Sequence, residues 1–224
     1  MGETYPIQLK MAGITAVVIG GGSVASRKVH SLLAGGARVM VVSPGIVDSL
    51  EAMVKENQVE WRKKLFSPED LEGATLVFAC TDHKETNEKV IHALQPGQWV
   101  NVADRPDLST FFVPAHFRRG LVTISVATDG ASPGLARKLK EQLKEEVDVA
   151  YGPYGEFLAS CRRVILERIK NESIRRELFY TLLEEEYLED FRRGEEGKAF
   201  NRFLKLVEDA SLKEARCKGE RGYE

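Results

Sequence analysis

Short apolar segments alternate with amphipathic segments over the first half of the chain. Apolar runs rich in β-branched side chains predict buried strands, and apolar positions at a spacing of three and four residues predict helices between them. The strands are expected at 15–19, 38–42, 59–62, 75–80 and 99–103. The helices are expected at 24–33, 46–54 and 83–94. Strands that alternate with helices predict an α/β fold with a parallel sheet, which we assign to residues 1–113.

The pattern changes in the second half of the chain. Residues 121–128 predict one mostly buried strand, and 135–147 predict a basic helix that begins at Ser132-Pro133, with Ser132 as the N-cap. One strand and one helix cannot bury both of their faces. We therefore expect residues 114–150 to form a small α+β dimerisation domain.

Helical spacing dominates the remainder of the chain. Gly152-Pro153-Tyr154-Gly155 indicates a boundary, since glycine and proline together interrupt regular structure. Beyond it, apolar residues recur on one face of successive helical segments. We predict an all-helical C-terminal domain over 151–224, with a frayed tail from Ser211.

The chemistry begins where the first predicted strand ends, at Gly20-Gly21-Gly22. A strand, a tight glycine turn and a helix form the phosphate-binding corner of a dinucleotide-binding βαβ unit. Gly20 makes the turn, Gly22 lets the backbone approach a pyrophosphate, and Ala25 packs closely against the strand. The free N–H groups at the start of the helix favour an anion there. We predict a Rossmann-type domain.

The ends of the neighbouring strands complete the predicted cofactor site. Many Rossmann folds carry an acidic residue at the position of Ser43, where it binds the adenosine ribose. Ser43 can still hydrogen-bond the ribose, and we take it to favour NAD over NADP weakly. Arg27 and Lys28, in the first helix, favour NADP instead. Asp82 either contacts the cofactor or is the N-cap of the helix at 83–94. The predicted cofactor-binding residues are Gly20, Gly22, Ser23, Val24, Ala25, Ser43, Pro44, Thr81 and Asp82.

Composition narrows the partners and the compartment. The formal net charge of −2 indicates neither nucleic acid nor a membrane surface as a partner. No signal-peptide h-region and no apolar run of about 20 residues occurs. The 3 cysteines are widely spaced, which is typical of a reducing cytoplasm. Without a CxxC or HExxH motif, we predict no dedicated metal site.

The fifth predicted strand runs into the segment NVADRPDLSTFFVPA at 101–115. Asp104 follows this strand directly, at the edge of the sheet where α/β enzymes place their chemistry. A carboxylate there is a candidate proton acceptor, although a turn residue before Arg105-Pro106 is the alternative interpretation. Asp107 is the local competitor and lies within the turn itself.

Taken together, these segments resemble the precorrin-2 dehydrogenase family, the dehydrogenase/chelatase module of siroheme synthase in its stand-alone form, without a methyltransferase domain. The resemblance covers residues 5–145 approximately. It rests on YPIQL at 5–9, VIGGGSVASRKVHSLLAGGARVMVVSP at 18–44, the segment at 101–115, and TDGASPGLARKLKEQL at 128–143.

The resemblance implies an activity and a set of roles. It implies NAD-dependent oxidation of precorrin-2 to sirohydrochlorin by a homodimer, with ferrous iron insertion as a further activity of some members. Asp104 matches the catalytic aspartate of the family, and Thr128 matches a position often occupied by Ser near the tetrapyrrole cleft. Because the substrate carries many carboxylates, we expect Ser132, Arg118 and Arg137 to contribute to its binding.

Two other functions remain open from the sequence. One is a dimeric NAD-sensing Rossmann module that binds the cofactor without turnover. The other is a chelatase whose glycine turn no longer binds NAD.

Overall fold

The computed structural model describes residues 4–220, with side chains described over 4–215. The chain divides into two compact units, Met1–Val113 and Pro114–Glu224. The second unit contains both the predicted strand-and-helix segment and the C-terminal helices. Among the described residues, no helix is long and apolar enough to cross a membrane.

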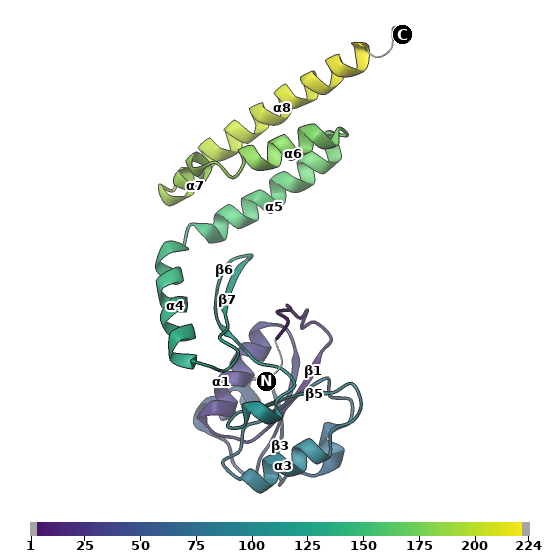
Figure 1. The fold of residues 1–224 in the computed structure, drawn as a ribbon, viewed down its shortest axis with the longest axis vertical. Helices are drawn as coiled ribbons and strands as arrows, with labels where there is room; N and C mark the ends of the chain where they lie inside the picture. The colour runs from purple at the N-terminus through teal and green to yellow at the C-terminus, as the bar shows by residue number, and fades with distance from the viewer. Residues whose placement is uncertain (1–3, 221–224) are drawn as a thin grey trace. The chain divides into compact units, whose positions relative to one another are not determined.

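The first unit is built on a parallel sheet in the order β3-β2-β1-β4-β5 (Figure 1). Its strands are β1 (Thr15–Ile19), β2 (Arg38–Val42), β3 (Glu60–Arg62), β4 (Leu76–Ala79) and β5 (Trp99–Val102). Its helices are α1 (Ser23–Ala34), α2 (Asp48–Lys55) and α3 (Lys84–His92), with short 3-10 helices η1 (Pro68–Leu71) and η2 (Pro106–Leu108). The strand order reverses between β1 and β4, and such a switch point opens a ligand crevice at the carboxyl ends of the strands.

The sheet is covered on both faces. Val18 belongs to the core that contains Val29 of α1, and its neighbour Val17 belongs to the core that contains Val90 of α3. Both valines on β1 are fully buried, and each such side chain contributes about 1.5–3 kcal/mol. The apolar runs in the sequence therefore reflect strands that are buried on two sides. The predicted Rossmann-type sheet is confirmed.

The second unit begins with an antiparallel hairpin of β6 (Ala115–Arg119) and β7 (Val122–Val126), against which α4 (Pro133–Glu146) packs. The prediction of a single, mostly buried strand at 121–128 is wrong. Half-buried residues alternate with exposed ones along both strands, as in a hairpin with one covered face. β6 was missed because His116, Arg118 and Arg119 break its apolar pattern.

Helices form the rest of the second unit: α5 (Tyr151–Arg168), α6 (Glu172–Thr181), α7 (Glu185–Arg192) and α8 (Glu196–Glu220). Figure 1 shows α5, α6 and α8 side by side. The helices share one core that is rich in aromatic side chains, in which the Phe157 ring contacts those of Tyr187, Phe191 and Phe203. The expected fraying from Ser211 is also wrong, since α8 continues to Glu220. The last part of the predicted tail, 221–224, lies outside the described residues.

Gly152-Pro153-Tyr154-Gly155 is no boundary, because the segment lies inside α5. Pro153 is the third residue of this helix, where an N–H has no partner within the helix and proline is tolerated. A Cβ atom on Gly120, at the hairpin turn, would lie 2.9 Å from the Gly152 carbonyl oxygen. Gly120 therefore allows close packing of the hairpin turn against α5, whereas a Cβ atom on Gly152 would meet its nearest neighbour only at 3.5 Å, an ordinary contact distance.

Candidate active site

The glycine turn has no room for a side chain at Gly20 but has open space beside Gly22. Gly20 has a φ of +121°, and a Cβ atom there would lie 2.6 Å from the Cys80 carbonyl oxygen, so no side chain fits. A Cβ atom on Gly22 would meet nothing within 4 Å. Gly22 is the N-cap of α1, and neither a capping side chain nor an acidic residue occupies the first turn. Free N–H groups facing open space fit a pyrophosphate.

Gly21 is a site residue that the sequence interpretation missed. A Cβ atom on Gly21 would lie 2.0 Å from the Gly45 carbonyl oxygen and 2.9 Å from Ser43 Oγ. The Gly21 carbonyl accepts a hydrogen bond of 2.9 Å from the Val47 N–H. The glycine turn is thus pressed against the loop after β2, and the run of consecutive glycines was the available signal.

Ser43 is buried and shapes that loop. Its hydroxyl donates a hydrogen bond of 2.7 Å to the Gly45 carbonyl, while its own carbonyl accepts one of 3.0 Å from Trp61 Nε1. A hydroxyl carries one proton, so Ser43 Oγ is left with acceptor capacity only. Its contact with a ribose stays a prediction.

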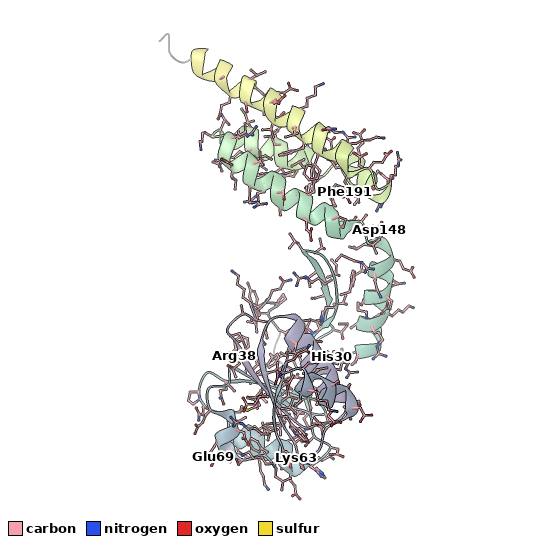
Figure 2. The ribbon with its side chains drawn as sticks, turned by 180° about the vertical axis from the view of Figure 1, so that it is seen from behind. His30, Arg38, Lys63, Glu69, Asp148 and Phe191 are labelled. Carbon is pink, nitrogen blue, oxygen red and sulfur yellow. The ribbon has the colours of Figure 1, made fainter. Side chains whose placement is uncertain are left out.

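A depression of about 530 Å³ lies beside α1 and the start of α2. Arg27 and His30 line it together with Ser49, and Figure 2 labels His30 on α1. Lys28 lies elsewhere: its Nζ is 5.7 Å from the centre of the Phe78 ring, and burial lowers the pKa of Lys28. Arg27 and Lys28 are adjacent in sequence, but Arg27 lines the depression while Lys28 lies against the Phe78 ring.

The end of β4 carries the predicted pair Thr81 and Asp82. The N-cap interpretation of Asp82 is wrong, because the N-cap of α3 is His83 and no side chain caps the helix. The Asp82 side chain is 95% exposed, with Oδ1 3.6 Å from His83 Nε2. Thr81 Oγ1 lies 2.8 Å from Asn87 Oδ1 and 3.0 Å from the His83 carbonyl oxygen. Thr81 therefore helps to fix the turn between β4 and α3.

Asp104 lies just beyond β5, which pairs with β4 in register, Ala79 opposite Val102. The residue is exposed, and Oδ1 accepts a hydrogen bond of 3.2 Å from Asn87 Nδ2. Sequence analysis missed Asn87. The signal was a polar residue one helical turn before Val90 on the buried face of α3.

The loop after Asp104 is tied back to β5 and to itself. The N–H of Val102 donates to Ser109 Oγ at 2.9 Å, and the N–H of Val100 donates to Thr110 Oγ1 at 2.8 Å. Arg105 forms a bidentate pair with Asp107, at 2.9 and 2.7 Å, which lowers the pKa of Asp107. Asp107 is therefore occupied in the turn, while Asp104 keeps one carboxylate oxygen without a protein donor among the described residues.

Cys80 follows β4 directly, next to this site. Burial raises the pKa of its thiol to about 11, so it remains protonated at neutral pH. It packs in the core that includes Phe78. The cysteine thus has a packing role, as its place in an apolar run predicts.

The predicted substrate-binding residues of the second unit fall into separate groups. The N–H of Ser132 donates to Thr128 Oγ1 at 3.2 Å, and Ser132 Oγ accepts from the Leu135 N–H at 3.2 Å, so Ser132 is the N-cap of α4 as predicted. Arg118 lies opposite Thr123 near the hairpin turn, and its Nε donates to the Gly120 carbonyl.

The register of the hairpin separates Arg118 from Thr128. The strand from Thr123 to Val126 alone spans about 10 Å, and Thr128 lies beyond Val126. Arg137 is exposed on α4. The structure therefore brings together Thr128 and Ser132, but not Arg118 with them.

No group of three or more His, Cys, Asp or Glu side chains that could hold a metal ion occurs among the described residues.

A match to a known family model defines the class of nucleotide-binding domain to which the first unit belongs. Residues 7–115 match the family model described as "Putative NAD(P)-binding". The glycine turn, the strand order and the open start of α1 define the same class from geometry: a Rossmann domain for a nicotinamide dinucleotide.

Relatives that match most of the chain define the family. Precorrin-2 dehydrogenase of Priestia megaterium is 30% identical over 82% of this chain and 91% of its own length. Precorrin-2 dehydrogenase of Bacillus subtilis (strain 168) is 30% identical over 74% of this chain and 98% of its own. The solved structure of "SirC, precorrin-2 dehydrogenase" is 28% identical with a TM-score of 0.78, covering 92% of this chain and 100% of that one. The chain belongs to the precorrin-2 dehydrogenase family.

Longer relatives contain the same region. Siroheme synthase of Methylobacillus flagellatus is 37% identical over 78% of this chain, which spans 38% of the length of that protein. The chain thus spans about two fifths of the siroheme synthases that it matches. The comparisons confirm the predicted family, the fold class and a nicotinamide dinucleotide as the cofactor.

Proposed function

We propose that the chain catalyses the NAD-dependent oxidation of precorrin-2 to sirohydrochlorin in siroheme biosynthesis. The observation that carries the proposal is the position of Asp104, exposed at the carboxyl edge of the sheet and held by a buried amide. Family membership supports the identity of the substrate. We further propose that the enzyme works in the cytoplasm as a homodimer formed through residues 114–150.

The reaction removes two electrons and two protons from a reduced tetrapyrrole, as one hydride and one proton. NAD, when bound, supplies the hydride acceptor. Gly20, Gly21 and Gly22 shape the backbone for the pyrophosphate, and the N–H groups at the start of α1 bind its charge. The carboxylate of Asp104 accepts the proton. Such general-base catalysis typically raises the rate about 10²- to 10⁴-fold.

The second unit contributes the proposed contacts with the substrate. Thr128 and Ser132 form a polar group at the start of α4, which has Pro133 at its first position and no acidic residue in its first turn. Arg118 and Arg137 offer exposed cations for carboxylates. Because Arg118 lies away from Thr128 on one hairpin, we propose that these residues bind different carboxylates of the macrocycle.

An anaerobic absorbance assay with precorrin-2 and either NAD or NADP tests the function. We expect sirohydrochlorin to form with NAD and at least tenfold more slowly with NADP. NAD binding without product would refute the proposal in favour of a cofactor sensor. Failure to bind NAD together with iron insertion into sirohydrochlorin would refute it in favour of a chelatase.

A further inference from the structure

Asn87 joins two parts of the candidate active site that come from different strands. It lies on α3 and is 3% exposed. Its Nδ2 donates to the Thr81 carbonyl at 3.0 Å and to Asp104 Oδ1 at 3.2 Å. Its Oδ1 lies 2.8 Å from Thr81 Oγ1, which can donate to it. One buried amide thus contacts both the turn after β4 and the carboxylate after β5.

The orientation of this amide is determined by its neighbours. The Thr81 carbonyl and Asp104 Oδ1 are both acceptors, so the NH₂ group must face them. A flipped amide would place its oxygen against two acceptors and lose both hydrogen bonds. Asparagine supplies two donors and one acceptor in this arrangement, which neither aspartate nor leucine can do.

We propose that Asn87 is the positioning residue for Asp104. The inference rests on the proposed function, because it assumes that Asp104 is the proton acceptor. Asn87 holds one carboxylate oxygen and leaves the other directed away from the protein donors, toward substrate. It also ties the direction of the carboxylate to the Thr81 turn, on the cofactor side of the same sheet edge.

The hydrogen bond from Asn87 restricts the rotamers of the Asp104 side chain. An exposed aspartate after a strand samples several rotamers, and general-base catalysis needs the reacting oxygen within hydrogen-bond distance of the proton. A hydrogen bond from a buried, rigid donor to a carboxylate selects one rotamer. Among the described residues, Asn87 provides the hydrogen bond that the Asp104 side chain accepts. Without it, a large share of bound substrate would face a misdirected carboxylate.

The experiment compares Asn87→Leu and Asn87→Asp, which retain the size of the side chain, with Thr81→Val and Gln98→Leu. Thr81→Val removes the donor to Asn87 Oδ1 but leaves the contact with Asp104. Gln98→Leu removes side-chain hydrogen bonds to the Leu71 and Ala74 carbonyls, at the opposite end of β5. It controls for a general loss of stability. Each folded variant is checked by its NAD dissociation constant.

We expect Asn87→Leu to lower kcat about 10- to 100-fold while the KM for NAD stays within about threefold. Asn87→Asp should lower kcat at least as much, because two carboxylates would face each other. Gln98→Leu should retain kcat within about threefold. Thr81→Val, at a predicted cofactor-binding residue, should raise the KM for NAD and lower kcat less than Asn87→Leu does. In an Asp104→Ala background, Asn87→Leu should cause no further loss, since its effect acts through the missing carboxylate.

Two results would overturn the assignment while the proposed function stands. One is a wild-type kcat in Asn87→Leu or Asn87→Asp. The other is a loss in Thr81→Val that equals the loss in Asn87→Leu, which would assign the effect to the cofactor turn. A wild-type chain that binds NAD without turnover would refute the proposed function, and the role of Asn87 with it.

Discussion

The two units of this chain are packed in different ways, and only the first is built on a sheet whose strand ends gather polar residues. In the first unit, small β-branched side chains fill both faces of a parallel sheet, and the closest approaches are between backbones, at Gly20 and Gly21. In the second unit, aromatic rings fill the space between helices, with Phe157 contacting the rings of Tyr187 and Phe191.

A parallel sheet ends in an open edge, where polar residues after each strand meet. Thr81 and Asp104 meet there because their strands are neighbours, and Asn87 reaches them from α3. The helical core has no such edge, and its buried carboxylates, Asp190 and Glu214, contact other residues of the same unit. The proposed proton acceptor therefore lies in the first unit, while the proposed substrate and dimer contacts lie in the second.

The aromatic core offers the largest effect on stability. Phe157→Ala should lower the free energy of unfolding of the second unit by about 3–5 kcal/mol, because it leaves a cavity among the surrounding rings. Urea unfolding followed by far-UV circular dichroism measures the loss. Leu212→Ala, at a side chain that is 60% exposed, is the control and should change stability by less than about 0.5 kcal/mol.

Phe157→Ala also tests whether the second unit unfolds independently of the first. Both tryptophans, Trp61 and Trp99, lie in the first unit, so tryptophan fluorescence reports on that unit alone. Phe157→Ala should leave the fluorescence transition and the affinity for NAD unchanged. A parallel shift of both transitions would contradict two separate cores.

The backbone contacts of the first unit offer the next effect. Gly21→Ala would place a Cβ atom 2.0 Å from the Gly45 carbonyl oxygen, so the loop after β2 must move. We expect a loss of about 1–3 kcal/mol in stability and at least tenfold weaker NAD binding. Gly45→Ala is the matched control, because a Cβ atom there meets nothing within 4 Å. Equal effects from both alanines would contradict the role of Gly21.

Asp70 makes the stability of the first unit depend on pH. Burial by itself raises the pKa of Asp70, but the Ser67 N–H and the cations of Lys64 and Arg62 outweigh burial, so the pKa is lowered. A lowered folded-state pKa contributes stability above the unfolded value of about 3.9, and this contribution is lost as the pH falls through the folded value.

Asp70→Asn should therefore destabilise the first unit by about 1–3 kcal/mol at neutral pH, and by progressively less below about pH 4. Tryptophan fluorescence in urea, measured across this range, gives the difference. Glu72→Gln, at the exposed residue that follows η1, is the control and should change stability little across this range. A constant difference between wild type and Asp70→Asn would refute the linkage.

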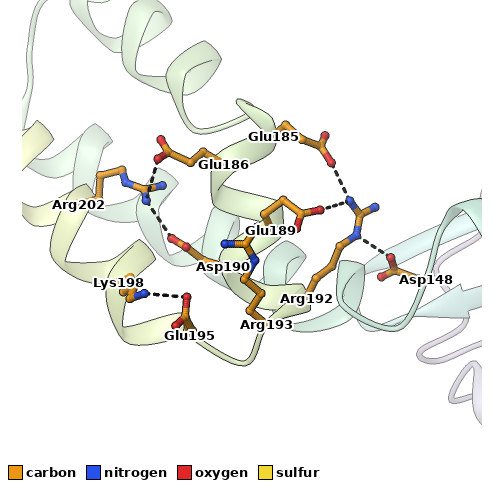
Figure 3. Close-up of polar contacts among 10 residues, drawn as sticks. All are labelled: Asp148, Glu185, Glu186, Glu189, Asp190, Arg192, Arg193, Glu195, Lys198 and Arg202. Atoms are coloured by element: carbon orange, nitrogen blue, oxygen red, sulfur yellow. Dashed lines mark hydrogen bonds and ion pairs between the residues drawn. The ribbon is translucent and has the colours of Figure 1, made fainter.

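The ion pairs on the outside of the second unit offer the smallest effect. Arg192 contacts Asp148, Glu185 and Glu189 at 2.7–2.8 Å, as Figure 3 shows. Arg192→Ala should lower stability at low salt and should lower it less in 1 M salt, where such pairs are screened. Arg193, with a single partner at 3.6 Å, is the control, and Arg193→Ala should have no measurable effect. Equal losses at both salt concentrations would contradict this.

Much of the first unit was predictable because its signals are local. A glycine run after a buried strand specifies a turn that admits no Cβ atom, and Gly20 shows this directly. The alternation of strands and helices predicts the parallel sheet, and the location of Asp104 follows from the end of its strand. Asn87 was not predicted, since its role depends on a contact between residues 17 positions apart in sequence.

The second unit was predicted less well because its signals are not local. Gly152 indicates a helix break in the sequence, but it lies inside α5, where the tertiary contact with the hairpin turn is made close by Gly120. β6 was missed because a hairpin with one exposed face tolerates charged residues such as Arg118. The N-cap at Ser132, which depends on neighbouring residues alone, was predicted correctly.

The central claim is that Asp104 accepts the proton in an NAD-dependent oxidation of precorrin-2. The measurement is the anaerobic rate of sirohydrochlorin formation by Asp104→Asn and Asp107→Asn, beside their NAD dissociation constants. We predict a loss of about 10²- to 10⁴-fold for Asp104→Asn, with NAD binding retained, and a rate within about threefold of wild type for Asp107→Asn. Turnover by Asp104→Asn at the wild-type rate would contradict the account.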